Sequence, residues 1–271
     1  MKYPGIDDPG WTAMIATGSI AGAPVMFLAE TESTNEVALA LARQGQATGT
    51  LVVAERQSRG RGRLGKFWVT QPETGLAVSM ILRPRLPPAE LARITLAVGV
   101  ALCRAVAAVT GLVPGLKWPN DLFLHQRKFC GMLAEADDPA GLQPVVVVGI
   151  GMNVNTPKAA FPEELRAKVT SLRDESGRSW SRSELLATMV DEISRKVAEL
   201  EQGDFAGILD QWRALDVTFG RELTWLSQVG QVVTGVSQGI DDQGRLLVRD
   251  REGVVHQVLS GDINLRKRFS K

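Results

Sequence analysis

The stretch AERQSRGRGRLGKFW, residues 54–68, distinguishes between the candidate folds of this chain, because residues 59–66 contain three glycines and four cations. The spacing Gly60-x-Gly62-x-x-Gly65 matches a dinucleotide fingerprint, but that site needs a helix directly afterwards, and KFWVTQPETG at 66–75 does not begin one. A P-loop needs Ser or Thr where Phe67 stands. Glycines let a ligand approach the backbone, and cations offset its negative charge. The loop therefore indicates a local anion site, with a solvated basic turn or a nucleic-acid contact as open alternatives.

The segments around this loop predict an α/β domain with a mixed sheet. Runs rich in apolar and β-branched residues, bounded by turn residues, predict strands at 25–30, 50–57, 75–84, 115–124, 128–136 and 144–155. The capping-box spacing from Ser33 to Glu36 predicts a helix that ends at Gly45. Residues 88–111 are apolar nearly all round, which is typical of a helix buried on most faces.

The C-terminal part of the chain has a different pattern. A second capping box, Ser181 to Glu184, begins a predicted helix that ends at Gly203, and a shorter helix covers 204–215. After Phe219, short alternating runs separated by glycine-containing turns predict a small β-barrel. We therefore expect three parts, which are a loosely docked arm at 1–24, a main domain at 25–216 and a barrel domain at 217–271.

Composition narrows the function. A formal net charge of +1 and a pI near 7.8 argue against a surface that binds polyanions in general. Cys103 and Cys130 are expected to be reduced core thiols, with a disulfide as the alternative. Because His125 and His256 are the only histidines, a Cys/His zinc cluster cannot form at the usual spacing. We see no signal segment and no uninterrupted apolar run of membrane length, so we expect a cytoplasmic protein.

Five ordered motifs resemble the biotin–protein ligase family. They are ESTN at 32–35, AERQSRGRGRLGKFW at 54–68, KWPNDL at 117–122, RKFCGMLAE at 127–135 and VVVVGIGMNVN at 145–155. The segments GIDDQGRLLV at 239–248 and SGDINLR at 260–266 look like that family's SH3-like barrel. The resemblance implies a class II synthetase-like catalytic domain. It also implies an enzyme that forms biotinyl-5′-AMP from biotin and ATP, then transfers biotin to a lysine of a biotin carboxyl carrier protein.

The resemblance further implies which residues bind biotin. The polar ureido ring needs directional hydrogen bonds, which Thr34 and Gln57 would make. Arg61 and Arg63 would bind the carboxylate and the phosphate, and Gly131 would leave room for the ring. The full implied set for biotin is Ser33, Thr34, Asn35, Gln57, Gly60, Arg61, Gly62, Arg63, Lys128 and Gly131. From the residues alone, a helix cap stays an alternative for Ser33, and a surface lysine stays an alternative for Lys128.

A second implied set binds ATP. It consists of Lys66, Trp68, Lys117, Asn120, Lys128 and Asn153, with Mg²⁺ held mainly by the nucleotide. Lys128, Arg63 and Asp121 are the implied catalytic residues. Lys128 would bridge biotin's carboxylate and the α-phosphate, and Asp121 would take a proton from the acceptor lysine.

Leu64 and Lys66 depart from the family pattern, since the loop more often has arginine at both positions. Lys66 keeps the charge but loses the bidentate fork, which bears on affinity for the adenylate and not on the reaction type. The alternatives are a lipoate–protein ligase or octanoyl transferase on the same fold, and a non-catalytic nucleic-acid or protein adaptor. Residues 1–24 are too few for a DNA-binding domain, so we expect no DNA partner. The sequence leaves a homodimer open.

Overall fold

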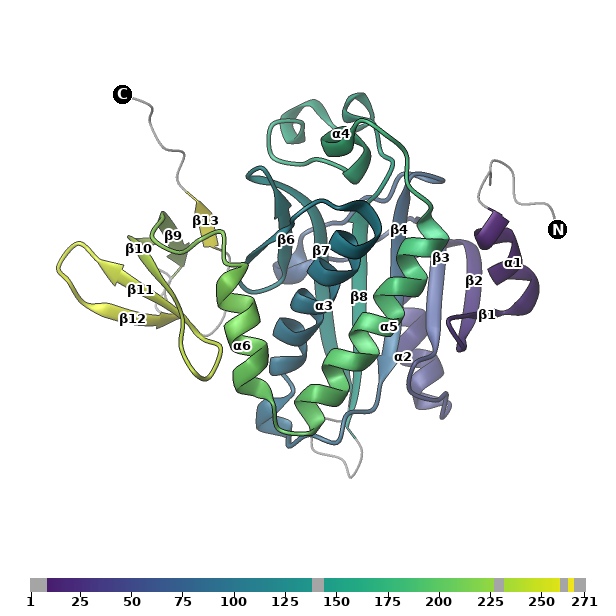
Figure 1. The fold of residues 1–271 in the computed structure, drawn as a ribbon, viewed down its shortest axis with the longest axis horizontal. Helices are drawn as coiled ribbons and strands as arrows, with labels where there is room; N and C mark the ends of the chain where they lie inside the picture. Colours follow the sequence, from purple (N-terminus) through teal and green to yellow (C-terminus); the bar gives the residue numbers. More distant parts are fainter. Residues whose placement is uncertain (1–8, 138–143, 227–231, 259–262, 266–271) are drawn as a thin grey trace.

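The computed structural model describes residues 9–137, 144–226, 232–258 and 263–265. Figure 1 shows a large sheet with helices packed in front of it and a small β domain to one side. The large sheet has eight strands in the order β1-β2-β3-β4-β8-β7-β6-β5. They are β1 (Ser19–Ile20), β2 (Ala23–Thr31), β3 (Leu51–Gln57), β4 (Gly75–Leu82), β5 (Gly115–Lys117), β6 (Asp121–Leu124), β7 (Arg127–Asp137) and β8 (Val145–Asn153). Strands β2 and β3 pair in parallel and the other neighbours pair antiparallel, so the predicted mixed sheet is confirmed.

Helices cover both faces of this sheet. They are α1 (Pro9–Thr17), α2 (Thr34–Arg43), α3 (Arg93–Thr110), α4 (Leu172–Ser176), α5 (Arg182–Glu201) and α6 (Phe205–Ala214), with 3₁₀ turns at Arg63–Gly65, Pro88–Glu90, Lys158–Ala160 and Glu163–Leu165. Helices α3 and α5 pack together over the main core. Helix α2 covers the opposite face, where a smaller core contains Val52, Ile81 and Val147. The site described below lies on the α2 face.

Helix α3 is apolar because it is the central core helix. Among the described residues it is long and apolar enough to cross a membrane by length and composition, yet 61% of it is buried inside the protein. Ile94, Leu102 and Val106 are inaccessible to solvent and belong to the main core. The prediction of a helix buried on most faces is therefore confirmed, and the core accounts for its composition.

The small domain is a five-stranded antiparallel sheet in the order β12-β11-β10-β9-β13. Its strands are β9 (Glu222–Leu226), β10 (Val232–Ile240), β11 (Leu246–Asp250), β12 (Val255–Val258) and β13 (Ile263–Leu265). Its contacts with the large domain include a hydrogen bond from Trp118 Nε1 to the carbonyl of Gly244 at 3.0 Å. The segment that leads into it is held by a parallel bridge between Leu116 and Asp216. Most of the segment SGDINLR at 260–266 lies outside the described residues.

Three local predictions need correction. Residues 9–24 are not loosely docked, since α1 buries Trp11 completely and Trp11 packs edge-on against Phe27 at 5.6 Å between ring centroids. Ser33 is the N-cap residue of α2 but its side chain makes no capping hydrogen bond, unlike Ser181, which accepts from Glu184 N. The single strand predicted over 115–124 is two strands, β5 and β6, separated at the step that contains Pro119, which has no N–H to donate.

Both cysteines are free thiols in the core, as predicted. Cys103 lies on α3 and Cys130 on β7, and both are buried. Burial raises the pKa of each thiol, so neither is a thiolate at neutral pH. The cysteines therefore contribute to packing and not to nucleophilic chemistry.

Candidate active site

The floor of the candidate site is a patch of sheet that lacks side chains. Gly151 of β8 pairs with Gly131 of β7, and Gly131 pairs with Asp121 of β6. In the neighbouring row, Gly149 of β8 pairs with Leu133 of β7. Residues opposite one another on adjacent strands lie about 5 Å apart, so the three glycines leave one continuous stretch of sheet without side chains of its own. A flat ring can lie directly on such a floor.

A cavity of about 130 Å³ lies above this floor. Five cations and one carboxylate line it, namely Arg61, Arg63, Lys66, Lys117, Lys128 and Asp121. This excess of positive charge in a walled cavity favours anions, although the whole chain is almost neutral. Of the residues proposed from the sequence, all but Gly60 and Asn153 line the cavity.

The N-terminus of α2 supplies the polar wall of the cavity. Gln57 Oε1 accepts hydrogen bonds from Thr34 N at 2.8 Å and Thr34 Oγ1 at 3.1 Å. Ser79 Oγ bonds to Thr34 Oγ1 at 2.8 Å and donates to Asn35 Oδ1 at 2.6 Å. Ser33, Thr34 and Asn35 are all buried. The groups predicted to recognise a ureido ring are therefore fixed in place by each other.

The glycine-rich loop folds back on itself over the cavity. Arg61 and Phe67 form an antiparallel bridge, Gly62 N donates to Lys66 O at 2.7 Å, and Trp68 N donates to Gly60 O at 2.8 Å. A Cβ on Gly60 would lie 2.3 Å from the carbonyl oxygen of Trp68, so this position excludes any side chain. Gly60 thus shapes the loop and lies outside the cavity lining.

The arginines of this loop are paired with acids or amides from elsewhere in the chain. Arg61 Nη2 lies 3.0 Å from Glu135 Oε2, and Arg59 Nη1 lies 3.2 Å from Glu32 Oε2. Arg63 Nη1 donates to Asn120 Oδ1 at 3.4 Å. Each of these three arginines therefore has a partner outside the loop.

The ring of Trp68 occupies part of the site. A Cβ on Gly151 would lie 2.3 Å from the indole ring, so the ring lies directly on the glycine floor. The Nε1 atom of Trp68 is buried without a hydrogen-bond partner. The cavity of about 130 Å³ is smaller than the roughly 300 Å³ at which small-molecule pockets usually begin. A ligand on this floor must therefore displace the ring.

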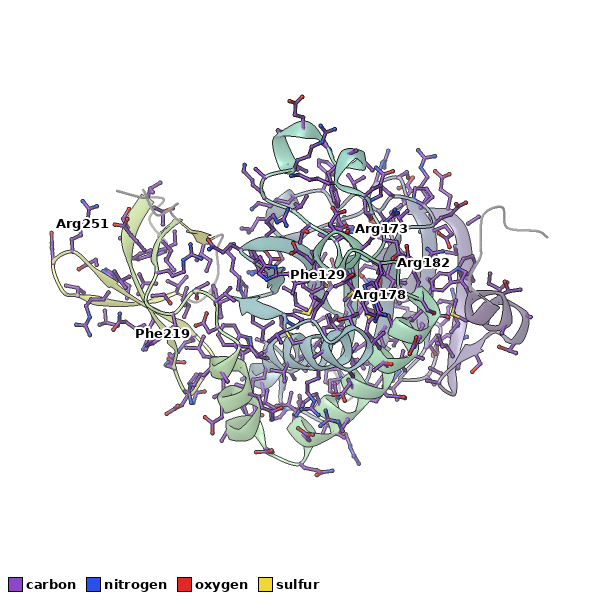
Figure 2. The ribbon with its side chains drawn as sticks, turned by 45° about the horizontal axis from the view of Figure 1, so that its top comes forward. Phe129, Arg173, Arg178, Arg182, Phe219 and Arg251 are labelled. Carbon is purple, nitrogen blue, oxygen red and sulfur yellow. The ribbon has the colours of Figure 1, made fainter. Side chains whose placement is uncertain are left out.

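Lys128 reaches the floor because of a bulge in the strand pairing. Leu122 pairs with Cys130 but Phe123 pairs with Lys128, so Phe129 is an extra residue on β7. Figure 2 shows Phe129 in the interior of the large domain, and its side chain is fully buried. Side chains alternate along a strand, so an unbulged β7 would point Lys128 toward the core with Cys130.

With the bulge, Lys128 lies on the same face as Gly131. Its Nζ lies 2.9 Å from where a Cβ of Gly131 would be, and 2.6 Å from Asp121 Oδ1. The ammonium also lies 5.5 Å from the centroid of the Trp68 ring. The structure therefore joins two of the implied catalytic residues in one ion pair at the edge of the floor.

Three other implied nucleotide ligands lie around this pair. Asn120 lines the cavity, and its Nδ2 donates to Met132 O at 2.6 Å. Lys117 lines the cavity beside Asp121, its partner in the β5–β6 register. Asn153 is buried at the end of β8, where its Nδ2 donates to Thr170 O at 3.1 Å. It lies outside the cavity lining, so a role at the nucleotide stays a prediction.

Besides Gly149 and Gly151 of the floor, sequence reasoning missed several residues that shape the site. Glu135 accepts hydrogen bonds from both Arg61 and Asn35, and Ser79 connects Thr34 with Asn35. Ile263 brings the small domain into the cavity lining. The period-two pattern of β7 puts Glu135 on the same face as Gly131, which was the one available signal. The others depend on long-range packing.

Comparison with known proteins identifies relatives of this chain. A family model described as "Biotin/lipoate A/B protein ligase family" matches residues 27–153, and one described as "Biotin protein ligase C terminal domain" matches residues 218–266. The biotin–[acetyl-CoA-carboxylase] ligase of Paracoccus denitrificans is 33% identical over 84% of this chain and 95% of its own length. The bifunctional ligase/repressor BirA of Bacillus spizizenii is 31% identical over 91% of this chain and 75% of its own length.

A solved structure agrees with these relatives. The biotin protein ligase of Aquifex aeolicus, in complex with biotin and ATP, superposes with a TM-score of 0.76 and 31% identity. The match covers 90% of this chain and 98% of that chain. The description of the first family model includes lipoate ligases, whereas that of the second names biotin protein ligase alone. Both domains, the relatives and the superposed fold thus agree, and the chain belongs to the biotin–protein ligase family of ligase enzymes.

Proposed function

We propose that this chain joins biotin to ATP as biotinyl-5′-AMP and transfers the biotinyl group to a lysine of a biotin carboxyl carrier domain. The observation that supports it best is the cavity itself, in which five cations surround a bare glycine floor beside a fixed polar wall. The wall suits a ureido ring and the cations suit a carboxylate next to a phosphate. The names of the relatives in Paracoccus denitrificans and Mycobacterium tuberculosis support a carboxylase as the destination.

In the first step, a carboxylate oxygen of biotin attacks the α-phosphorus of ATP, and pyrophosphate leaves. Two anions must meet, so their repulsion has to be offset in a site shielded from water. Arg61 and Arg63 line the cavity from the loop and Lys128 lines it from the floor, and we assign all three to the carboxylate and the phosphate. Trp68 leaves the glycine floor when biotin binds and closes over the nucleotide.

In the second step, the amine of the acceptor lysine attacks the mixed anhydride and AMP leaves. The amine must lose a proton to become a nucleophile. Asp121 is the acid that lines the cavity, but its Oδ1 lies 2.6 Å from Lys128 Nζ. We infer that Lys128 turns toward the phosphate when ATP binds, which frees Asp121 to accept the proton.

Mg²⁺ enters this reaction with ATP, where it offsets the charge of the phosphates. The described residues hold no cluster of three or more His, Cys, Asp or Glu side chains that would bind the ion. We therefore assign Mg²⁺ to the nucleotide's phosphates, with Asn120 as the amide oxygen of the cavity wall. We also propose a cytoplasmic location, where ATP and carboxylases are available.

Lys128→Ala tests this assignment. With biotin, ATP and Mg²⁺, the variant should release pyrophosphate at least about 100-fold more slowly than the wild-type protein, because the cation that bridges the two anions is lost. Lys168→Ala is a matched control, since Lys168 is exposed and its backbone pairs with that of Lys128. Near-normal adenylation by Lys128→Ala would reject the role of Lys128. Lipoyl-AMP formation by the wild-type protein, without biotinyl-AMP, would reject the choice of biotin.

A further inference from the structure

The carboxylate of Glu175 is a buried group for which the reaction above has no use. Glu175 lies on the short helix α4, and its side chain is only 4% exposed. Three donors surround it, with Thr170 Oγ1 at 2.6 Å, Arg127 Nη2 at 2.7 Å and His125 Nδ1 at 2.6 Å. A buried carboxylate is costly unless it is fully paired, so this set of contacts fixes all four side chains together.

Two of these partners lie just before Lys128, His125 in the turn and Arg127 at the start of β7. His125 and Gln126 connect β6 to β7 with φ values of 45° and 69°. Turns with two left-handed residues favour glycine and asparagine, which this one lacks. The bond from His125 to Glu175 holds one strained residue, and Arg221 Nη2 donates to Gln126 Oε1 at 3.3 Å on the other side. The turn is therefore maintained by its side-chain contacts.

The third partner, Thr170, belongs to a segment that pairs with Lys128 itself. Lys128 N donates to Lys168 O at 2.9 Å, and Thr170 N donates to Lys128 O at 2.9 Å. Lys128 and Val169 thus form a parallel bridge at the bulge, where ladder pairing between β6 and β7 is interrupted. A bulge leaves backbone groups unpaired, and this segment satisfies them.

We propose that Glu175 is a positioning residue for Lys128, because it fixes the turn before Lys128 and the 168–170 segment beside it, and so keeps the bulge that aims the ammonium at the glycine floor. This proposal rests on the role of Lys128 proposed above. The same segment accepts the hydrogen bond of Asn153, since Asn153 Nδ2 donates to Thr170 O. Glu175 therefore also connects the ends of β7 and β8 that face the nucleotide in the proposed reaction.

The electrostatics of the group agree with this geometry. Burial raises the pKa of Glu175, but hydrogen bonds from Thr170 and His125 and the charge of Arg127 outweigh it, so the pKa lies below its usual value. Glu175 is thus ionised at neutral pH. An ionised carboxylate accepts from all three donors at once, whereas the amide of glutamine offers a single acceptor oxygen.

Glu175→Gln, Lys128→Ala and the double variant test the proposal through single-turnover pyrophosphate release. We expect Glu175→Gln to lower the adenylation rate about tenfold with little change in KM for biotin, since a small displacement of a reacting group is costly. In the Lys128→Ala background the same substitution should have no further effect, because the group it positions is gone. Glu201→Gln is the matched control, as Glu201 also accepts three hydrogen bonds, all from Arg85, away from the site.

Three outcomes would overturn the proposal. One is a wild-type adenylation rate in Glu175→Gln. Another is that Glu175→Gln slows adenylation by the same factor in the wild-type and Lys128→Ala backgrounds, which is what a purely structural role would give. If Glu175→Gln does not fold, Thr170→Val replaces it, because this variant removes one of the three donors at nearly constant volume and should show the same dependence on Lys128. The third outcome that would overturn the proposal is a wild-type adenylation rate in Thr170→Val. If Lys128→Ala alone keeps normal adenylation, the proposed function fails first, which is a separate result.

Discussion

Replacing Gly149 with alanine puts a methyl group where the site has no room. The added Cβ would lie 2.1 Å from Asn35 Oδ1 and 2.8 Å from Asn35 Cγ. Asn35 is 4% exposed and held at both ends of its amide. Its Oδ1 accepts from Ser79 at 2.6 Å, and its Nδ2 donates to Glu135 at 2.7 Å. The side chain therefore cannot turn away without losing buried hydrogen bonds.

The size of the effect follows from these contacts. Overpacking a well-filled site costs about 1–3 kcal/mol, and each buried hydrogen bond that is lost costs about 0.5–1.5 kcal/mol. Together they predict a loss of about 2–4 kcal/mol in the free energy of unfolding, or roughly 4–16 °C in Tm. Because Asn35 shares the polar wall with Thr34, biotin should also bind about tenfold more weakly.

Thermal unfolding and calorimetric titration with biotin measure both effects. The decisive control is Asn35→Ala, which removes the atoms that the new methyl group would meet. In that background, Gly149→Ala should cost less than about 0.5 kcal/mol, because the two residues no longer collide. An equal cost in both backgrounds would show that the loss does not come from Asn35, and the argument from close contact would be refuted.

Two further substitutions give contrasting expectations. Gly131→Ala puts a Cβ 2.9 Å from Lys128 Nζ and 3.4 Å from Asp121 Oδ1, which are the mobile ends of side chains. Adenylation should therefore slow about tenfold or more, while the free energy of unfolding changes by less than about 1 kcal/mol. A stability loss as large as that of Gly149→Ala would contradict this expectation. Burial raises the pKa of Asp216 despite hydrogen bonds from Thr218, so the wild-type protein loses stability as pH rises from the unfolded pKa near 4 through the higher folded value. In denaturant unfolding, the free energy of unfolding of Asp216→Asn should therefore rise relative to that of the wild-type protein as the pH increases from 3 to 7. A difference between the two proteins that does not change with pH would refute the direction of the pKa shift.

Local patterns were enough to predict most helices and strands. The capping box at Ser181 begins α5 at the next residue, and the apolar run at 88–111 contains α3. Such features depend on neighbours three or four residues away, which the sequence displays directly. The motif order placed most of the candidate site in one cavity through family resemblance. Predicting that these residues lie close together required no knowledge of the strand register.

The unpredicted features all depend on long-range pairing. The glycine floor exists because Gly131 and Gly151 are paired across β7 and β8, and nothing in either segment alone specifies this register. The bulge at Phe129 reverses the face on which Lys128 would otherwise lie, and alternation along β7 predicts the wrong face. Trp11 looked like part of a loose arm because its partners, Phe27 and Arg182, are distant in sequence.

The ion pairs of the loop show how a basic, glycine-rich segment can pair its cations within the protein and still offer them to an anion. Arg61 is 40% exposed and its partner Glu135 is 27% exposed, so the ion pair is partly solvated. Pairs of this kind contribute at most about 1 kcal/mol, since water and salt screen them. An anionic ligand in the cavity approaches the same guanidinium in a less solvated setting, where the attraction is stronger. The acids outside the loop therefore hold its arginines near the site without competing strongly with an anionic ligand for them.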